Sequence, residues 1–132
     1  MAGQGEEASQ NLTGVWNGRY LYPREFEPVS FVATLIETAS RLTGTTHEPG
    51  NETLGTVRYA SLHGRRDGSS VSFVKTYDKA GLQPIDYLGI LNRDATEIEG
   101  TWRIRGNWSG TFLMIRAPGK AVAVFRKVAE RV

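Results

Sequence analysis

Cysteine is absent from the 132 residues of this chain. Its absence excludes disulfides, thiolate nucleophiles and cysteine-ligated metals, and it fits a reducing compartment. The sequence also lacks any apolar run near the roughly 20 residues that a membrane helix requires. The first ten residues are polar and have neither the basic start nor the apolar centre of a signal peptide. We therefore expect a cytoplasmic protein with no membrane partner.

A strong excess of charge of one sign is lacking as well. Lysine and arginine number 16 against 14 acidic residues, a formal net charge of +2. The basic residues are scattered along the chain, and the pair Arg65-Arg66 falls in a predicted turn with Asp67-Gly68. Nucleic-acid binding needs a basic stripe or patch, so no nucleic-acid partner is expected.

Motifs of catalysis and metal binding are few. The sequence contains no Gly-x-Ser-x-Gly and no Walker glycine-rich loop. His47 and Glu48 are adjacent, and such a pair could bind a metal or act as a base, but two ligands are too few for a convincing metal site. We interpret both as surface residues at the end of a strand, and we expect no metal and no cofactor.

Most of the sequence consists of segments in which apolar and polar residues alternate, and turn signals separate these segments. This pattern predicts an all-β fold whose short connections join antiparallel neighbours, an eight-stranded up-and-down barrel. The barrel domain is expected over 12–117, after a disordered leader at 1–11. A change to helical spacing predicts a short amphipathic helix at 118–132, with a ninth strand as the alternative. The predicted strands span 13–22, 29–38, 41–47, 54–63, 69–78, 85–92, 96–105 and 108–116.

The first predicted strand has a large aromatic side chain near its start and a glycine two residues later. Trp16, Tyr20 and Tyr22 share one face, and Gly18 lies between them. A tryptophan there can plug one end of a barrel, and the glycine permits the tight coiling that closure needs.

Lys75 is predicted to lie on the inner face of its strand, together with Phe73 and Tyr77. A buried lysine must find a partner or lose its charge. Tyrosine hydroxyls or a bound anion could supply that partner. The alternative places Lys75 near the rim, with its ammonium group extended to water.

Several aromatic side chains on inner faces could line a pocket, because tyrosine combines an apolar body with a polar hydroxyl. The alternative is that they fill a narrow barrel completely. With Lys75, the residues predicted to bind a ligand are Tyr20, Tyr22, Tyr77, Tyr87 and Trp102; Trp108 is a further candidate.

Gly14-Val15-Trp16 at the head of a meander of strands resembles the calycin superfamily of lipocalins, fatty-acid-binding proteins and avidins. In lipocalins a late basic residue stacks on this tryptophan, and the resemblance implies that Arg116 does so here. Leu12-Thr13-Gly14-Val15-Trp16 is similar to the start of avidins, but the later biotin-contacting positions cannot be matched.

Two further resemblances concern other barrels. Trp16-Asn17-Gly18 with Tyr22-Pro23 is similar to nitrobindin haem barrels, whose iron ligand is a late histidine; the two histidines here, at 47 and 63, are not late, so haem is not expected. The strand patterns Phe73-x-Lys75-x-Tyr77 and Tyr87-x-Gly89 look similar to those of cyclic-nucleotide sensors in phage defence.

These patterns predict a barrel that binds a small, partly apolar molecule without catalysis, with an anionic group as an option opposite Lys75. A first alternative is an interaction module with a solid core, for which outward apolar residues and a homo-oligomer would be evidence. A second alternative is an enzyme that uses Lys75 or a tyrosine as an acid–base group. The outward apolar residues are Leu88, Ile90, Leu113 and Ile115.

Overall fold

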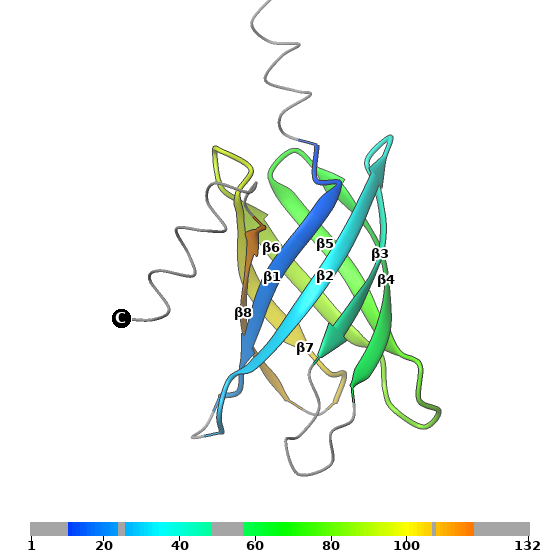
Figure 1. Cartoon of the computed structure of the whole chain (residues 1–132). Coiled ribbons are helices and arrows are strands. Elements are labelled where there is room, and N and C mark those ends of the chain that lie inside the picture. The colour runs from blue at the N-terminus through cyan, green and yellow to red at the C-terminus, as the bar shows by residue number, and fades with distance from the viewer. Residues whose placement is uncertain (1–10, 24–25, 49–56, 107, 118–132) are drawn as a thin grey trace, which may run out of the picture.

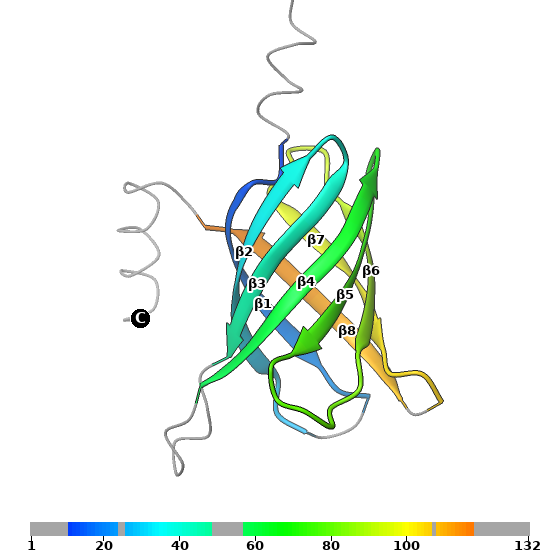
Figure 2. The ribbon, with the colours of Figure 1, turned by 90° about the vertical axis from the view of Figure 1, so that its right-hand side faces the viewer.

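The chain forms a closed β-barrel in a computed structural model that describes residues 11–23, 26–48, 57–106 and 108–117. Each strand pairs antiparallel with the next along the chain, and the last pairs with the first (Figures 1 and 2). The predicted eight-stranded antiparallel meander is therefore confirmed. The strands are β1 (Gly14–Leu21), β2 (Val29–Thr38), β3 (Arg41–Glu48), β4 (Arg58–Asp67), β5 (Ser70–Tyr77), β6 (Ile85–Leu91), β7 (Glu97–Arg103) and β8 (Ser109–Arg116).

Tight turns explain why consecutive strands become neighbours. Ala39 and Ser40 join β2 to β3 with φ angles of 50° and 71°. Positive φ at both central residues matches the right-handed twist of a hairpin. Between β6 and β7, the side-chain oxygen of Asn92 accepts hydrogen bonds from the backbone N–H groups of Thr96 and Glu97, at 2.8 and 2.9 Å. Local chemistry thus fixes the antiparallel order.

The fourth strand differs from its predicted span of 54–63. It continues to Asp67, so the placement of Arg65 and Arg66 in a turn was wrong. The turn lies at Gly68-Ser69 instead, and Gly68 has a φ of 60°. Gly64 is a strand residue, and glycine is needed there because a Cβ would lie 1.9 Å from the carbonyl oxygen of Ser72 on β5. Glycine therefore marks a close approach of two strands here and not a turn.

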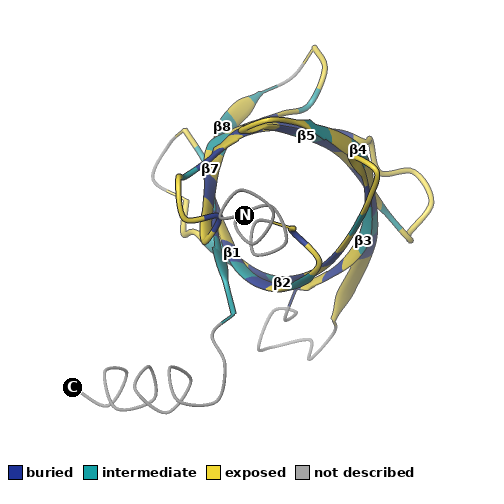
Figure 3. Cartoon of the chain, turned by 90° about the horizontal axis from the view of Figure 1, so that it is seen from above, coloured by how far each residue is buried: buried dark blue, intermediate teal, exposed yellow. Residues whose placement is uncertain are grey.

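Alternation along the strands places the apolar side chains in the barrel interior. Buried residues, dark blue in Figure 3, accordingly alternate with more exposed ones along the ribbon. The middle of the barrel is filled by rings. Phe73 stacks on Tyr87 at 4.9 Å, and Phe112 meets the same tyrosine edge-on at 4.9 Å. Gly18 makes room for Phe31, since a Cβ on Gly18 would lie 2.2 Å from that ring. These packed rings fill the interior between β5, β6 and β8.

Trp16 closes the end of the barrel at which β1 begins, and this end is uppermost in Figure 1. The indole N–H of Trp16 donates to the carbonyl oxygen of the buried Leu12 at 2.9 Å. The guanidinium carbon of Arg116 lies 5.1 Å from the centre of the Trp16 ring, within cation–π range. Arg116 also donates to the backbone carbonyl of Asn11. This end therefore has a plug whose polar atom is satisfied and whose outer face is covered.

The predicted leader at 1–11 and tail at 118–132 lie outside the described residues, apart from Asn11. Within the residues that are described, no helix has the length and hydropathy needed to cross a membrane.

Candidate ligand-binding site

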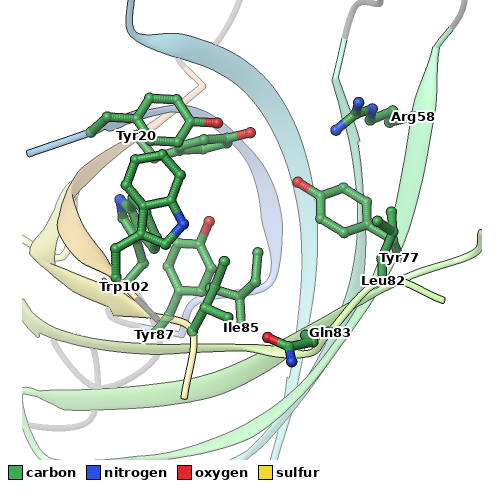
Figure 4. A pocket seen from close by; sticks show the side chains of 11 residues that line it. Tyr20, Arg58, Tyr77, Leu82, Gln83, Ile85, Tyr87 and Trp102 are labelled. Atoms are coloured by element: carbon green, nitrogen blue, oxygen red, sulfur yellow. The ribbon is translucent and has the colours of Figure 1, made fainter. Parts of the chain in front are cut away.

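A pocket of about 180 Å³ lies at the other end of the barrel, where β1, β5 and β7 end and β4, β6 and β8 begin. Its walls are mainly aromatic and aliphatic, with few polar groups. Figure 4 shows Tyr20 and Trp102 on one side, and Arg58 and Tyr77 across from them. The pocket is lined by Tyr20, Tyr22, Arg58, Tyr77, Leu82, Gln83, Ile85, Tyr87, Trp102, Ile104 and Trp108.

Tyr22 lies at the centre of the aromatic wall. Its ring centre is 5.7 Å from Tyr20, 5.6 Å from Trp102 and 5.3 Å from Trp108. The first two contacts are edge-on, an arrangement that aromatic pairs favour. The indole N–H of Trp102 donates to the carbonyl oxygen of Leu21 at 2.9 Å, which fixes that ring across the β1 strand. The wall is therefore held in place by its own contacts.

A buried ion pair lies in the interior beside this pocket. Lys75 on β5 and Glu48 on β3 are only 1% and 3% exposed, and Lys75 Nζ is 2.6 Å from Glu48 Oε2. The two strands are not neighbours in the sheet, since β4 separates them. The pair therefore bridges the inside of the barrel, and its opposite charges cancel.

Two tyrosines complete the surroundings of the Glu48 carboxylate. Tyr77 donates to Oε2 at 2.6 Å, and Tyr20 donates to Oε1 at 2.9 Å. Burial raises the pKa of both tyrosines far above the ordinary value, and the neighbouring carboxylate raises the pKa further. Both hydroxyls therefore stay protonated and act as donors. Three donors around one buried carboxylate offset the cost of removing it from water.

Aromatic rings surround the Lys75 ammonium. The centres of the Tyr77, Tyr20 and Phe31 rings are 4.8, 4.9 and 5.0 Å from Nζ. Burial lowers the pKa of Lys75, and the Glu48 carboxylate opposes that shift. Ring faces carry partial negative charge and so help to hold an ammonium group away from water.

The expectation that Glu48 lies on the surface was wrong. Strand β3 continues through Glu48, and the two-residue period that buries Leu42 and Thr46 also turns Glu48 inward. His47, one position earlier, faces outward and is exposed. Two signals could have identified Glu48. It lies at an even spacing from the inward residues Leu42 and Thr46, and a buried Lys75 needs a carboxylate partner.

The residues predicted to bind a ligand divide into two groups. Five of them line the pocket, whereas Lys75 does not, because it lies deeper and is engaged by Glu48. Two of the tyrosine hydroxyls that could have bound Lys75, those of Tyr20 and Tyr77, instead donate to Glu48. An anion opposite Lys75 is therefore not required for charge balance. The five that line the pocket are Tyr20, Tyr22, Tyr77, Tyr87 and Trp102.

Arg58 is the charged pocket residue that the sequence analysis did not identify; it also did not identify Leu82, Gln83, Ile85 and Ile104. Arg58 opens β4, is exposed, and its guanidinium carbon lies 5.9 Å from the centre of the Tyr77 ring. Of the described residues that line the pocket, Arg58 alone carries a formal charge. It therefore gives the pocket mouth a positive character that the interior ion pair does not supply.

One inward polar group is not satisfied. Thr46 precedes Glu48 on the inner face of β3, and its Oγ1 is the one buried side-chain oxygen or nitrogen, among those described, with no hydrogen-bond partner. Such a group costs free energy compared with an apolar side chain of the same shape.

Comparisons add no relative: neither a known protein-family model nor a curated protein matches this chain. The closed barrel is compatible with a calycin-like fold, but its architecture does not identify a specific family. In the part of the chain that the structure describes, no three histidine or acidic side chains gather as metal ligands would.

Proposed function

We propose that this barrel binds a small, partly apolar molecule without catalysis, in the aromatic pocket at its open end. The observation that carries the proposal is a pocket of about 180 Å³ with a fixed aromatic wall and, among the described residues that line it, one charged side chain, Arg58. Apolar burial supplies affinity in such sites, and a few polar groups supply orientation.

Catalysis by Lys75 is less well supported. Its lowered pKa would suit an acid–base group. Lys75 is not among the residues that line the pocket, however, and its ammonium is 2.6 Å from Glu48. A catalytic group must reach the reacting atoms, so this arrangement favours a structural ion pair.

A role as an interaction module draws support from β6, where Leu88 and Ile90 are 59% and 56% exposed on the outer face. Exposed apolar patches mark interfaces. Leu113 and Ile115 on β8 contribute less, because both are half-buried. The same barrel can bind a ligand inside and a second copy outside, so this function is compatible with the first.

Native mass spectrometry of the protein from its own cells, compared with denaturing conditions, tests both functions. A bound small molecule should add mass that is lost on denaturation. Trp108→Ala should lose the added mass, and Leu88→Ser should keep it. A dimer that Leu88→Ser dissociates would support the interaction module. A bare wild-type protein that also fails to bind added single-ring compounds would contradict ligand binding.

A further inference from the structure

We propose that the pocket takes a single-ring aromatic carboxylate, with its ring against the aromatic wall and its carboxylate on Arg58. This inference rests on the proposed function and names the chemical class of its ligand. Three properties of the pocket carry it: its size, its walls and the position of its charge.

The size limits the buried part of the ligand to about one ring. A pocket of about 180 Å³ is slightly larger than the roughly 150 Å³ apolar cavity known to admit benzene. One ring with a short substituent therefore fits, while a fatty-acid chain or a fused-ring nucleoside does not fit inside.

The walls favour a flat ring over a branched aliphatic group. Trp102 meets Tyr20 edge-on at 6.1 Å, and Trp108 is 6.4 Å from Trp102, also edge-on. Edge-on neighbours present both ring faces and ring edges to the space between them. A guest ring can then form offset-stacked or edge-to-face contacts with each wall.

The positive charge at the pocket favours an anionic ligand. The Lys75–Glu48 pair is internally neutral, so Arg58 decides the sign of the site. Among the described residues, no carboxylate lies within ion-pair distance of Arg58. A guanidinium group matches a carboxylate with two parallel hydrogen bonds.

Three of the neutral polar groups that line the pocket already have partners, and Arg58 is the described lining residue that carries a positive charge. The Tyr20 and Tyr77 hydroxyls already donate to Glu48, and the Trp102 N–H donates to Leu21. An aromatic cage by itself would equally suit a quaternary ammonium ion. Arg58 at the mouth makes that choice unfavourable, because like charges repel.

The test is calorimetric titration of the full chain with four probes: benzoate, benzyl alcohol, benzyltrimethylammonium and acetate. Benzoate should bind about tenfold more tightly than benzyl alcohol, and acetate should not bind measurably. Arg58→Gln should remove the tenfold preference, so that benzoate binds no more tightly than benzyl alcohol. Arg58→Lys should keep part of the preference, because it retains the charge but loses the forked geometry.

Arg103→Gln is the matched control. Arg103 ends β7 at the same end of the barrel but is exposed on the outer face. It should leave every affinity unchanged. Equal losses in Arg58→Gln and Arg103→Gln would overturn the assignment, since general positive potential would then explain the binding.

The remaining outcomes separate the two proposals. Benzyl alcohol binding as tightly as benzoate, or the ammonium probe binding most tightly, would overturn the ligand class while ligand binding stands. Acetate binding as tightly as benzoate would overturn the role of the ring. Failure of every ring probe to bind would overturn the single-ring ligand class, and together with a bare protein in native mass spectrometry it would overturn the proposed function itself.

Discussion

The two ends of the barrel both place tryptophan on inner faces, but they use it differently. At the closed end Trp16 is fully buried, bonded to Leu12 and covered by Arg116. At the open end Trp108 and Tyr22 remain half-buried beside a pocket. At the closed end the indole ring is buried and its N–H is hydrogen-bonded, both by contacts within the chain. The open end keeps aromatic surface and a cation available, which is what a binding site requires.

The largest expected effect comes from Trp16→Ala at the closed end. Removing a fully buried indole leaves a cavity and should cost about 3–5 kcal/mol of unfolding free energy, measured in a urea titration. Trp108→Ala at the open end should cost clearly less, because its side chain is only half-buried. Equal losses at both ends would show that the open end is core and would contradict the comparison.

The next effect concerns the ion pair between the ends. Glu48→Gln leaves the buried Lys75 without its carboxylate and should cost about 3–5 kcal/mol, whereas replacing both, by Glu48→Gln with Lys75→Met, should recover part of the loss. Asp86→Asn removes the exposed partner of Arg105 and should cost under about 1 kcal/mol. A double variant no more stable than Glu48→Gln would argue against the pair.

The stability of Glu48→Gln should also depend on pH in a defined direction. Glu48 raises the pKa of Lys75, so its loss should lower that pKa further below the ordinary value. Between the lowered folded pKa and the ordinary unfolded pKa, the unfolded chain binds more protons than the folded one. The stability of Glu48→Gln should therefore rise with pH through that window. A stability that falls with pH there would show that Lys75 is not the titrating group.

The smallest effect should be a gain. Thr46→Val replaces the buried hydroxyl that lacks a partner and should stabilise the fold by about 1 kcal/mol. Thr45→Val, on the exposed outer face of the same strand, is the control and should change stability by less than about 0.5 kcal/mol. A loss in Thr46→Val would indicate that the hydroxyl takes part in the polar cluster around Glu48.

The sequence by itself determined the strands and their faces. A period of two assigns each side chain to one side of a strand, so the inward positions of Lys75 and Tyr77 and the meander order followed from local pattern. The same period does not show where a strand ends, so residues beyond the predicted end are assigned wrongly. That is why Glu48 was placed on the surface and why Arg65 and Arg66 were placed in a turn.

Only the tertiary structure decided which inward residues meet. Glu48 joins Lys75 from 27 positions away and Tyr20 from 28, across strands that do not pair with each other. Such contacts depend on how closure and strand stagger align the inner faces, and no local period encodes that alignment. Closure of the barrel also pairs Lys75 with Glu48, so that the interior has no net charge from this pair. The charged side chain that lines the pocket is therefore Arg58, at its mouth.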